Sequence, residues 1–386
     1  MLPPADAAPC FHGGAFFEAV GPRFDDLGRR HGVVNADVLD AWFDPAPAVL
    51  DALREHLPWL VRTSPPTHAE GLVATIASAW DVPASTVVVG AGSSDLMFRT
   101  LPRWLPVGGT ALLLDPTYGE YAHVAEHVCH ARVVRHTLRR DEGYRLDLDR
   151  WRADVHRHRP DLAVLVHPNN PTGSRAARAD LVAALEAVPT STRVWVDEAY
   201  AAYLGPGASV ADVAARRPNI AVCTSLSKGW ALSGMRAAFL ATSPAEAAVL
   251  RGLTPPWCVG LPAQVAAVAA LGSPDYYAAR IAETHGLRAD LVAALAATDP
   301  ALDVRAGAAN AVLVHLPTDG PTAAAVVAAC RDRGLFVRDI AAMGPSVGAH
   351  TVRVAVKDAA TQGVMAARFR EAWAAVQEAH LSGRET

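Results

Sequence analysis

The sequence predicts an α/β protein built on a largely parallel sheet, with a smaller α+β lobe formed mainly by the last third of the chain. Short apolar runs rich in β-branched residues alternate with longer Ala/Leu-rich stretches of helical periodicity. This alternation is typical of βαβ units, whose sheet is covered by helices on both faces. The chain has 386 residues, of which 51% are hydrophobic, so it can form two or three cooperating lobes with a sizeable core.

The expected elements follow the chain in order. Strands of the large lobe are expected at residues 87–89, 111–114, 162–167, 193–196, 220–225 and 237–241. Helices are expected between them at 94–105, 118–127 and 176–187. The last third is expected to form a helix at 276–297, a strand at 311–315, a helix at 322–333, a strand at 351–356 and a helix at 361–379. We therefore expect a large domain over residues 40–275 and a small domain over residues 1–39 and 276–386.

Composition excludes several classes of function. The formal net charge of −4, with no basic tract, argues against nucleic-acid and anionic-membrane partners. No apolar run reaches the length of about 18 residues that a membrane span requires, and the first ten residues lack the features of a signal peptide. The scattered cysteines form no C-x-x-C pair and are expected to be reduced thiols: Cys10, Cys129, Cys223, Cys258 and Cys330. We expect a cytoplasmic protein.

Lysine is rare in this chain. Only Lys228 and Lys357 are lysines among 35 basic residues, which indicates a strong bias toward arginine. A position that keeps lysine under such a bias can need a primary amine that loses its proton, because arginine stays charged in proteins. The two lysines are therefore the first candidates for chemistry.

Polar motifs follow three of the expected strands. His-Pro-Asn-Asn-Pro-Thr-Gly occupies residues 167–173, Val-Asp-Glu-Ala-Tyr occupies 196–200, and Ser-Leu-Ser-Lys occupies 225–228, with Arg236 eight residues later. Each motif alone has a structural explanation: a turn, a helix cap or a chance pattern. Together, at the carboxyl ends of parallel strands, they favour a ligand site, because open α/β sheets bind ligands at that edge.

This combination resembles the fold-type-I pyridoxal-phosphate (PLP) enzymes of aminotransferase class I/II. It is most similar to the branch that contains histidinol-phosphate aminotransferase and threonine-phosphate decarboxylase. The resemblance covers about residues 87–356. It implies an aspartate-aminotransferase-like large domain with a mixed, mostly parallel seven-stranded sheet, PLP as cofactor, and an amino donor and a keto acceptor as substrates. It further implies a homodimer with active sites at the subunit interface.

The resemblance also assigns roles around the cofactor ring. Lys228 would hold the PLP aldehyde as a Schiff base and then move the α-proton, and an amine is the side chain able to do both. Asp197 would pair with the protonated pyridine nitrogen. Tyr200 and Asn170 would hydrogen-bond the phenolic oxygen of the ring, and Tyr118 would stack on its face.

A Gly-rich segment at residues 90–95 supplies the expected phosphate site. It joins a strand to a helix, so backbone N–H groups at the helix start can bind an anion. The hydroxyl groups of the third motif and the guanidinium of Arg236 would also donate hydrogen bonds to the phosphate. The phosphate is thus expected to bind Gly92, Ser93, Ser94, Ser225, Ser227 and Arg236. A dinucleotide fingerprint is excluded, because Asp95 stands where G-x-G-x-x-G needs its third glycine.

Two arginines are candidate substrate ligands. An inward-pointing Arg353 on a valine-rich strand is unfavourable unless paired, and the family uses this arginine for a substrate carboxylate or phosphate. Arg338 either binds a substrate phosphate, as in the family, or forms a salt bridge near Asp339. In the family, a tyrosine reaches across the dimer interface to the cofactor phosphate of the partner subunit. Thr63 stands at that position here, so the sequence does not show which group makes this contact, or whether it is made. His-Gly-Gly at 12–14 and the segment 335–339 resemble the decarboxylase side of the branch.

Some alternative functions stay open and others are excluded by the sequence. Transamination is the expected reaction, on an amine that carries an acidic group, but decarboxylation or β,γ-elimination would use the same lysine, aspartate and tyrosine. A Ser-x-x-Lys hydrolase needs a K-T-G motif, whereas Lys357 precedes Asp358. A cofactor-binding regulator ranks last, because no helix-turn-helix segment precedes the lobe. The Glu/His/Cys spacing at 126–130 suits no zinc site, so no metal is expected.

Overall fold

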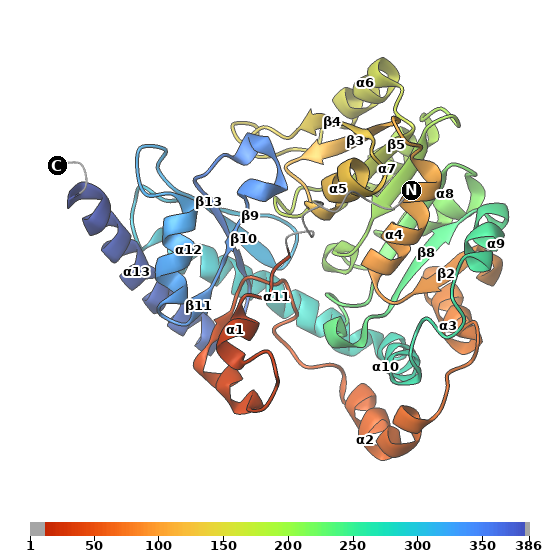
Figure 1. The fold of residues 1–386 in the computed structure, drawn as a ribbon, viewed down its shortest axis with the longest axis horizontal. Helices are drawn as coiled ribbons and strands as arrows, with labels where there is room; N and C mark the ends of the chain where they lie inside the picture. The colour runs from red at the N-terminus through yellow and green to blue at the C-terminus, as the bar shows by residue number, and fades with distance from the viewer. Residues whose placement is uncertain (1–11, 383–386) are drawn as a thin grey trace.

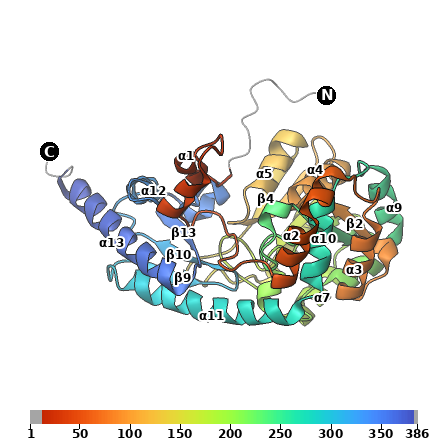
Figure 2. The ribbon, with the colours of Figure 1, turned by 90° about the horizontal axis from the view of Figure 1, so that it is seen from below.

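The computed structural model describes residues 12–382, which form two lobes joined by one long helix (Figure 1). The larger lobe contains a central sheet between layers of helices, and the smaller lobe contains a second sheet. The joining helix, α11 (Pro274–Ala296), runs beneath both lobes (Figure 2). Cys10 and the rest of the first ten residues, where no signal peptide is expected, lie outside the described residues.

The central sheet has seven strands, and its order is β2-β8-β7-β6-β5-β3-β4. The strands are β2 (Val87–Gly90), β3 (Thr110–Asp115), β4 (Arg132–Thr137), β5 (Leu162–Val166), β6 (Arg193–Asp197), β7 (Ile220–Ser225) and β8 (Ala238–Thr242). In this sheet only β8 runs opposite to the other strands. Since β2 and β7 both oppose β8, their carboxyl ends lie at the same edge as those of the other parallel strands. This confirms the predicted mixed, mostly parallel seven-stranded sheet.

Both faces of this sheet are buried, which explains why its strands are nearly continuous apolar runs. Successive side chains of a strand point to opposite faces. In β5, Ala163 and Leu165 pack into one hydrophobic cluster, and Val164 and Val166 pack into the other. The first cluster is covered by α2 (Pro47–Arg62), α3 (Glu70–Trp80), α6 (Leu148–His158), α7 (Arg178–Glu186), α8 (Ala211–Arg216) and α10 (Leu261–Leu271). The second is covered by α4 (Ser93–Trp104), α5 (Glu120–His123) and α9 (Pro244–Gly252).

The smaller lobe is an antiparallel sheet of order β12-β13-β10-β9, packed against two helices of its own and the C-terminal part of α11. These elements are β9 (Asp303–Ala306), β10 (Ala311–His315), β12 (Arg338–Asp339), β13 (Thr351–Ala355), α12 (Ala323–Arg331) and α13 (Ala359–Ser382). Near the N-terminus, α1 (Phe16–Val20) precedes β1 (Val34–Asn35), which pairs with β11 (Leu335–Phe336). This pairing joins the N-terminal segment to the smaller lobe. Among the helices of residues 12–382, none is long and apolar enough to span a membrane.

Two local expectations need correction. The edge strand β4 was not among the strands expected individually, because its Arg-Val-Val-Arg-His-Thr sequence is polar and its side chains are partly exposed. The helix expected at 118–127 is α-helical only over Glu120–His123 and continues as a π-helical turn over Val124–Val128. The division into domains at residues 40 and 275 stays a prediction.

Candidate active site

A cavity of about 200 Å³ lies at the carboxyl edge of the central sheet, where it faces the smaller lobe. Its lining includes nearly all the residues expected from the sequence: Ser93, Ser94, Tyr118, Asn170, Asp197, Tyr200, Ser225, Ser227, Lys228, Arg236, Arg338 and Arg353. Gly92 lies beside it, because a Cβ added there would collide with Nη2 of Arg236, which lines the cavity. The fold thus brings the predicted site residues together from both lobes.

The site residues of the large lobe are held in place by the ends of strands and by the side-chain amide of Asn169. Asp197 is the last residue of β6 and Ser225 the last of β7. In the loop after β5, Asn169 donates to the carbonyl of Pro116 at 2.9 Å and accepts from Oγ1 of Thr117, also at 2.9 Å. This amide ties the loop that carries Asn170 to the loop that carries Tyr118.

The floor of the cavity is a buried carboxylate. Oδ2 of Asp197 accepts a hydrogen bond from the Tyr121 hydroxyl at 2.7 Å, and Oδ1 accepts one from the Ala199 amide at 2.8 Å. Nε1 of Trp195 donates in turn to Oη of Tyr121 at 2.9 Å. Burial raises the pKa of Asp197, while these hydrogen bonds oppose the rise. Tyr121 is a site residue that the sequence did not mark, since it belongs to no motif.

Lys228 is held by a second unanticipated residue. Its Nζ lies 3.2 Å from Oδ1 of Asp40, in the segment before α2. Burial lowers the pKa of Lys228, the nearby cations Arg353 and Arg236 lower it further, and Asp40 opposes both effects. A lowered pKa increases the fraction of the amine that is uncharged near neutral pH, and only the uncharged amine can act as a nucleophile or base.

Arg353 is a buried cation on β13. Its Nη1 donates to Oδ1 of Asn170 at 2.6 Å, and its Nη2 donates to the carbonyl of Asp37 at 2.7 Å. Its Nε finds no hydrogen-bond partner within residues 12–382. Burial lowers its pKa to about 10, so it stays charged at neutral pH. Arg338 forms an ion pair with Oδ1 of Asp37 at 2.7 Å, so its carboxylate partner is Asp37 rather than Asp339.

A third unanticipated group is the buried carboxylate of Glu120, at the start of α5. It accepts a hydrogen bond from Oγ of Ser94 at 3.0 Å and lies 3.2 Å from Nε2 of His12. The hydrogen bond to Glu120 raises the pKa of His12, and Nδ1 of His12 lies 3.4 Å from the Tyr118 hydroxyl. The His-Gly-Gly segment seen in the sequence therefore lies at the mouth of this cavity.

The residues present fit a phosphorylated pyridine aldehyde. Gly92 has a φ of +92°, and a side chain there would collide with the Arg236 guanidinium, so a backbone cradle is kept open beside that cation. Helix α4 begins at Ser93, and its free N–H groups favour an anion. Asp197 suits a protonated ring nitrogen, and Lys228 suits an aldehyde. Within the described residues, no group of three or more His, Cys, Asp or Glu side chains is arranged to hold a metal.

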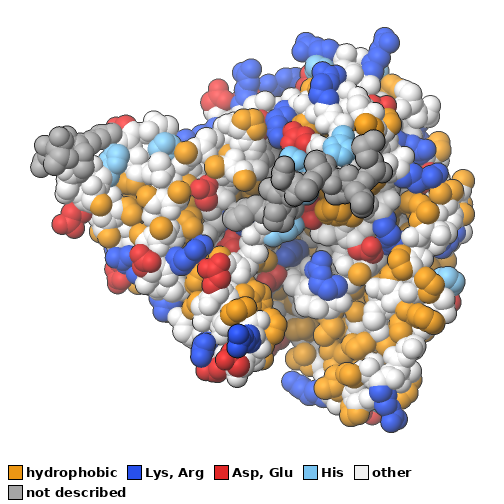
Figure 3. Space-filling model, viewed as in Figure 1, with side chains coloured by type: hydrophobic (Ala, Val, Ile, Leu, Met, Phe, Trp, Pro, Cys, Tyr) orange, Lys and Arg blue, Asp and Glu red, His pale blue; other side chains and the backbone are white. Residues whose placement is uncertain are grey.

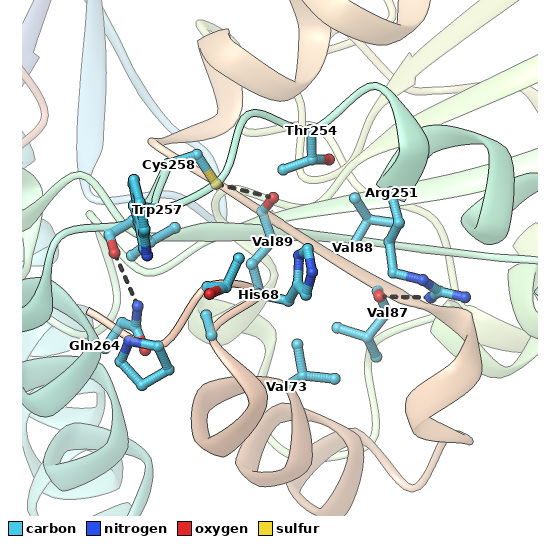
Figure 4. Close-up of a pocket in the computed structure, with 14 residues that line it drawn as sticks. His68, Val73, Val87, Val88, Val89, Arg251, Thr254, Trp257, Cys258 and Gln264 are labelled. Atoms are coloured by element: carbon cyan, nitrogen blue, oxygen red, sulfur yellow. Dashed lines mark hydrogen bonds between the residues drawn. The ribbon is translucent and has the colours of Figure 1, made fainter. Parts of the chain in front are cut away.

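A second hollow lies between α3, β2 and the segment before α10 (Figure 4). Its volume of about 20 Å³ leaves room for about one water, so it is no substrate site. Nε2 of Gln264 donates to the carbonyl of Val259 at 2.8 Å, and Nη1 of Arg251 donates to that of Val87 at 3.2 Å. These bonds brace the segment that presents Trp257 at the surface.

A lysine and a buried carboxylate at neighbouring strand ends, with an anion cradle beside them, define a PLP-dependent enzyme of fold type I. The sequence profile described as aminotransferase class I and II matches residues 37–369. The chain belongs to this family, whose members are PLP-dependent transferases that use an amino donor and a keto acceptor.

Individual relatives agree with this assignment. The histidinol-phosphate aminotransferase of Aeromonas hydrophila is 36% identical over 260 residues, which cover 66% of this chain and 69% of that protein. The histidinol-phosphate aminotransferase of Sinorhizobium meliloti, solved in complex with pyridoxal 5'-phosphate, has a TM-score of 0.80 at 23% identity and covers 96% of both chains. The L-threonine-O-3-phosphate decarboxylase of Porphyromonas gingivalis has a TM-score of 0.73 at 19% identity, over 87% of this chain and 98% of that one. The predicted fold and family resemblance are thereby confirmed.

Proposed function

We propose that this protein is an aminotransferase whose substrate is an amino acid, or a related amine, that carries an acidic carboxylate or phosphate group. Lys228 is its catalytic amine. The observation that carries the proposal is that Lys228, Asp197 and the buried Arg353 line one cavity. The first two suit the cofactor, and the third suits an anionic substrate group.

Each cofactor-facing residue has a distinct task. Bound PLP supplies an electron sink for the substrate's α-carbon. Asp197 would hold the ring nitrogen protonated, while Asn170 and Tyr200 would donate to the phenolic oxygen, with Tyr118 packed on the ring. Lys228 would bind the aldehyde carbon and, once released by the substrate amine, carry the proton that leaves the α-carbon. The cofactor phosphate would accept hydrogen bonds from the backbone N–H groups of Gly92, Ser93 and Ser94, from the hydroxyls of Ser225 and Ser227, and from the guanidinium of Arg236.

The cations of the cavity support an acidic substrate. Arg353 lines the cavity and is 3% exposed, and its Nε has no hydrogen-bond partner among residues 12–382. Arg338 and His12 line the same cavity, and each is already paired with a carboxylate, Asp37 and Glu120 respectively. A guanidinium fork recognises carboxylate and phosphate in two parallel hydrogen bonds. We assign Arg353 to the substrate carboxylate and Arg338 to a second acidic group.

Exposed apolar side chains support a homodimer. On α2, Leu57, Trp59 and Val61 are 51%, 50% and 72% exposed, and Trp257, whose backbone amide donates to the carbonyl of Thr67, is 56% exposed. Figure 3 shows hydrophobic side chains gathered over the part of the large lobe where α2 and α10 lie. Contiguous exposed apolar surface of this kind marks an interaction site. A second copy of the chain is the proposed occupant, with the active sites at the interface; Thr63 directly follows α2.

Residence in the cytoplasm is part of the same proposal. Four cysteines of the described range are free thiols: Cys129, Cys223, Cys258 and Cys330. Three of them are buried, and unpaired thiols are typical of a reducing compartment.

A donor screen tests the reaction. The PLP-loaded protein is mixed with single amino acids and with phosphate-bearing amines, and its absorbance is followed by stopped flow. Conversion of the cofactor to its amine form by a carboxylate- or phosphate-bearing donor supports the proposed aminotransferase. Release of CO2 without that conversion would establish the decarboxylase alternative. A spectrum that no amine changes would contradict both.

A further inference from the structure

A second large cavity lies beside the end of the Asn-Asn-Pro-Thr-Gly loop. Its volume is about 600 Å³, within the range of roughly 300–1,000 Å³ that is typical of small-molecule sites. No residue of the described chain lines both this cavity and the active-site cavity. Its lining comes from the large lobe, from α11 and from the turn after β9, and it includes Arg145, Thr172, Arg175, Tyr203, His285 and Arg288.

The charged side chains that line this cavity are all basic. Within residues 12–382, three arginines and one histidine line it, and no aspartate or glutamate does. Arg145 is already paired with Asp147, at 3.1 Å. In the same described range, neither Arg175 nor Arg288 has a carboxylate within ion-pair distance. Two guanidinium groups thus face the cavity without a counterion from the described chain.

Arg288 is half-buried, and its guanidinium is fixed in place. Its Nη1 donates to the carbonyls of Ala308 and Ala309 at 3.1 and 3.0 Å, and its Nη2 lies 3.0 Å from Nδ1 of His285. Burial lowers the pKa of Arg288 and of His285, and neighbouring arginines lower both further. The positive charges therefore repel one another here, and a bound anion would relieve that repulsion.

Hydrogen bonds hold the walls of the cavity together. The amide of Leu146 donates to Oγ of Ser174 at 3.0 Å, which ties the segment before α6 to the loop after β5. The amide of Ala308 donates to the carbonyl of Gly173 at 2.8 Å, which ties the smaller lobe to the same loop. The cavity is therefore formed by backbone segments in fixed positions, and the arginines are presented from them.

We propose that this cavity is a second anion site, which binds a phosphate-bearing small molecule between Arg175 and Arg288. A phosphate monoester carries a charge of about −1.5 to −2 at neutral pH and three acceptor oxygens, which suits two guanidinium forks. In the neutral ring of His285, Nδ1 accepts from Arg288, so Nε2 carries the hydrogen that can be donated to the anion. The site goes beyond the proposed function and does not depend on the role of Lys228.

The bound molecule would lie against two segments of the active site. Oγ1 of Thr172 accepts from Nδ2 of Asn169 at 3.0 Å, and this amide ties together the loops that carry two of the cofactor-facing residues. The hydroxyl of Tyr203 lies 3.5 Å from the carbonyl oxygen of Lys228. Since no lysine of the described chain lines this cavity, the molecule is held there and is not converted.

Calorimetric titration with inorganic pyrophosphate tests the site. Full-length protein is loaded with PLP, reduced with borohydride and freed of excess PLP, so that the cofactor phosphate stays in its own site. Absorbance of the pyridoxyl group checks that one is present per chain. We expect pyrophosphate to bind at low ionic strength, with an affinity that falls as salt is added, because salt screens the attraction. Wild-type protein that binds no pyrophosphate would overturn the proposal.

Variants place the bound anion in one cavity or the other. Arg175→Gln should weaken pyrophosphate binding by about tenfold, since it removes a charge-assisted contact. Arg175 is exposed, so this variant should keep the fold. The exposed Arg370→Gln, the matched control, should bind as the wild type does. The site should also survive in Arg353→Ala, which removes the proposed substrate cation of the active site. Binding that is lost in Arg353→Ala and unchanged in Arg175→Gln would overturn the proposal.

Hydrogen exchange locates the anion without any substitution. Pyrophosphate should slow backbone exchange in peptides that cover residues 172–176 and 284–289, and it should leave the peptide that covers residues 90–95 unchanged. Slower exchange at 90–95 alone would place pyrophosphate in the active site and overturn the proposal. Neither measurement uses an amino donor, so failure of the donor screen would count against the proposed function and not against this site.

Discussion

The side-chain oxygen of Asn170 accepts a hydrogen bond of 2.6 Å from the Arg353 guanidinium, across a separation of 183 residues. This bond joins the loop after β5 in the large lobe to β13 in the smaller lobe. It connects a residue proposed to face the cofactor ring with one proposed to bind the substrate. A movement of one lobe relative to the other would therefore change the proposed cofactor contact of Asn170 and the proposed substrate contact of Arg353 together.

Arg353→Ala should impair substrate use and spare the cofactor. The variant removes a buried guanidinium. Losing its charge-assisted hydrogen bond to the substrate costs about 2–5 kcal/mol, which lowers kcat/KM by about tens- to thousands-fold. PLP affinity, measured by equilibrium dialysis, should change little. Arg236→Ala should show the reverse order, with PLP lost first, and the exposed Arg370→Ala serves as control. Loss of PLP from Arg353→Ala with substrate affinity intact would show that the two arginines are exchanged.

Lys228 should carry the cofactor covalently. Purified PLP-loaded protein is expected to be yellow, and borohydride reduction should leave the pyridoxyl group on the peptide that contains Lys228. Lys228→Arg should bind PLP without the covalent band and lose turnover, because a guanidinium is no usable nucleophile at neutral pH. Labelling at Lys357, the other lysine of the chain, is the result that contradicts the assignment.

Asp197→Asn should keep the fold and much of the cofactor but lose activity severely. The amide can still accept from Tyr121, as Oδ2 of Asp197 does at 2.7 Å, yet it cannot hold the pyridine nitrogen protonated. Circular dichroism, PLP titration and turnover separate these effects. Turnover near the wild-type level would mean that Asp197 is not the ring partner. Tyr121→Phe is the matched variant, because it removes the hydrogen bond and keeps the carboxylate.

Trp59→Glu should weaken the proposed dimer. It places a charge on α2, the helix on which Leu57 and Val61 are also more than half exposed, and burying that charge at an interface would be unfavourable. Light scattering over a concentration series should show a shift toward monomer. Val364→Glu on α13, where valine is 43% exposed, is the control away from the patch. A wild-type protein that is monomeric and active would contradict the dimer proposal.

Glu198 should make stability depend on pH. Burial raises the pKa of this carboxyl from 4.5 to about 7, although the Ser209 hydroxyl and the Val210 amide donate to it. Because the folded pKa is the higher one, its stabilising contribution is complete below pH 4.5 and is lost as pH rises through 7. Relative to Glu198→Gln, the wild type should lose about 2–3 kcal/mol of unfolding free energy from pH 5 to pH 8.

Urea denaturation of the cofactor-free protein at several pH values measures this difference, with the exposed Glu378→Gln as control. A difference between wild type and Glu198→Gln that does not change with pH would place the pKa of Glu198 near its ordinary value.

Local patterns were sufficient for most of the fold. The runs that form β5 and β7 are short, apolar and buried on both faces, so they stand out in the sequence, and β10 coincides with its expected range. The edge strand β4 did not stand out, because one side of an edge strand meets water and tolerates Arg132 and Arg135. The irregular turn after α5 was also missed, since a π-helical turn has no distinct apolar period.

The sequence by itself determined the kind of chemistry. Lys228, Asp197 and Asn170 lie in short motifs at strand ends, and the carboxyl ends of parallel strands necessarily share one edge. Only the tertiary structure decided which side chains surround them. Asp40 is 188 residues from Lys228, and Tyr121 is 76 residues from Asp197. Such contacts depend on which loops meet at that edge and how the two lobes pack, and no local period or motif encodes that arrangement.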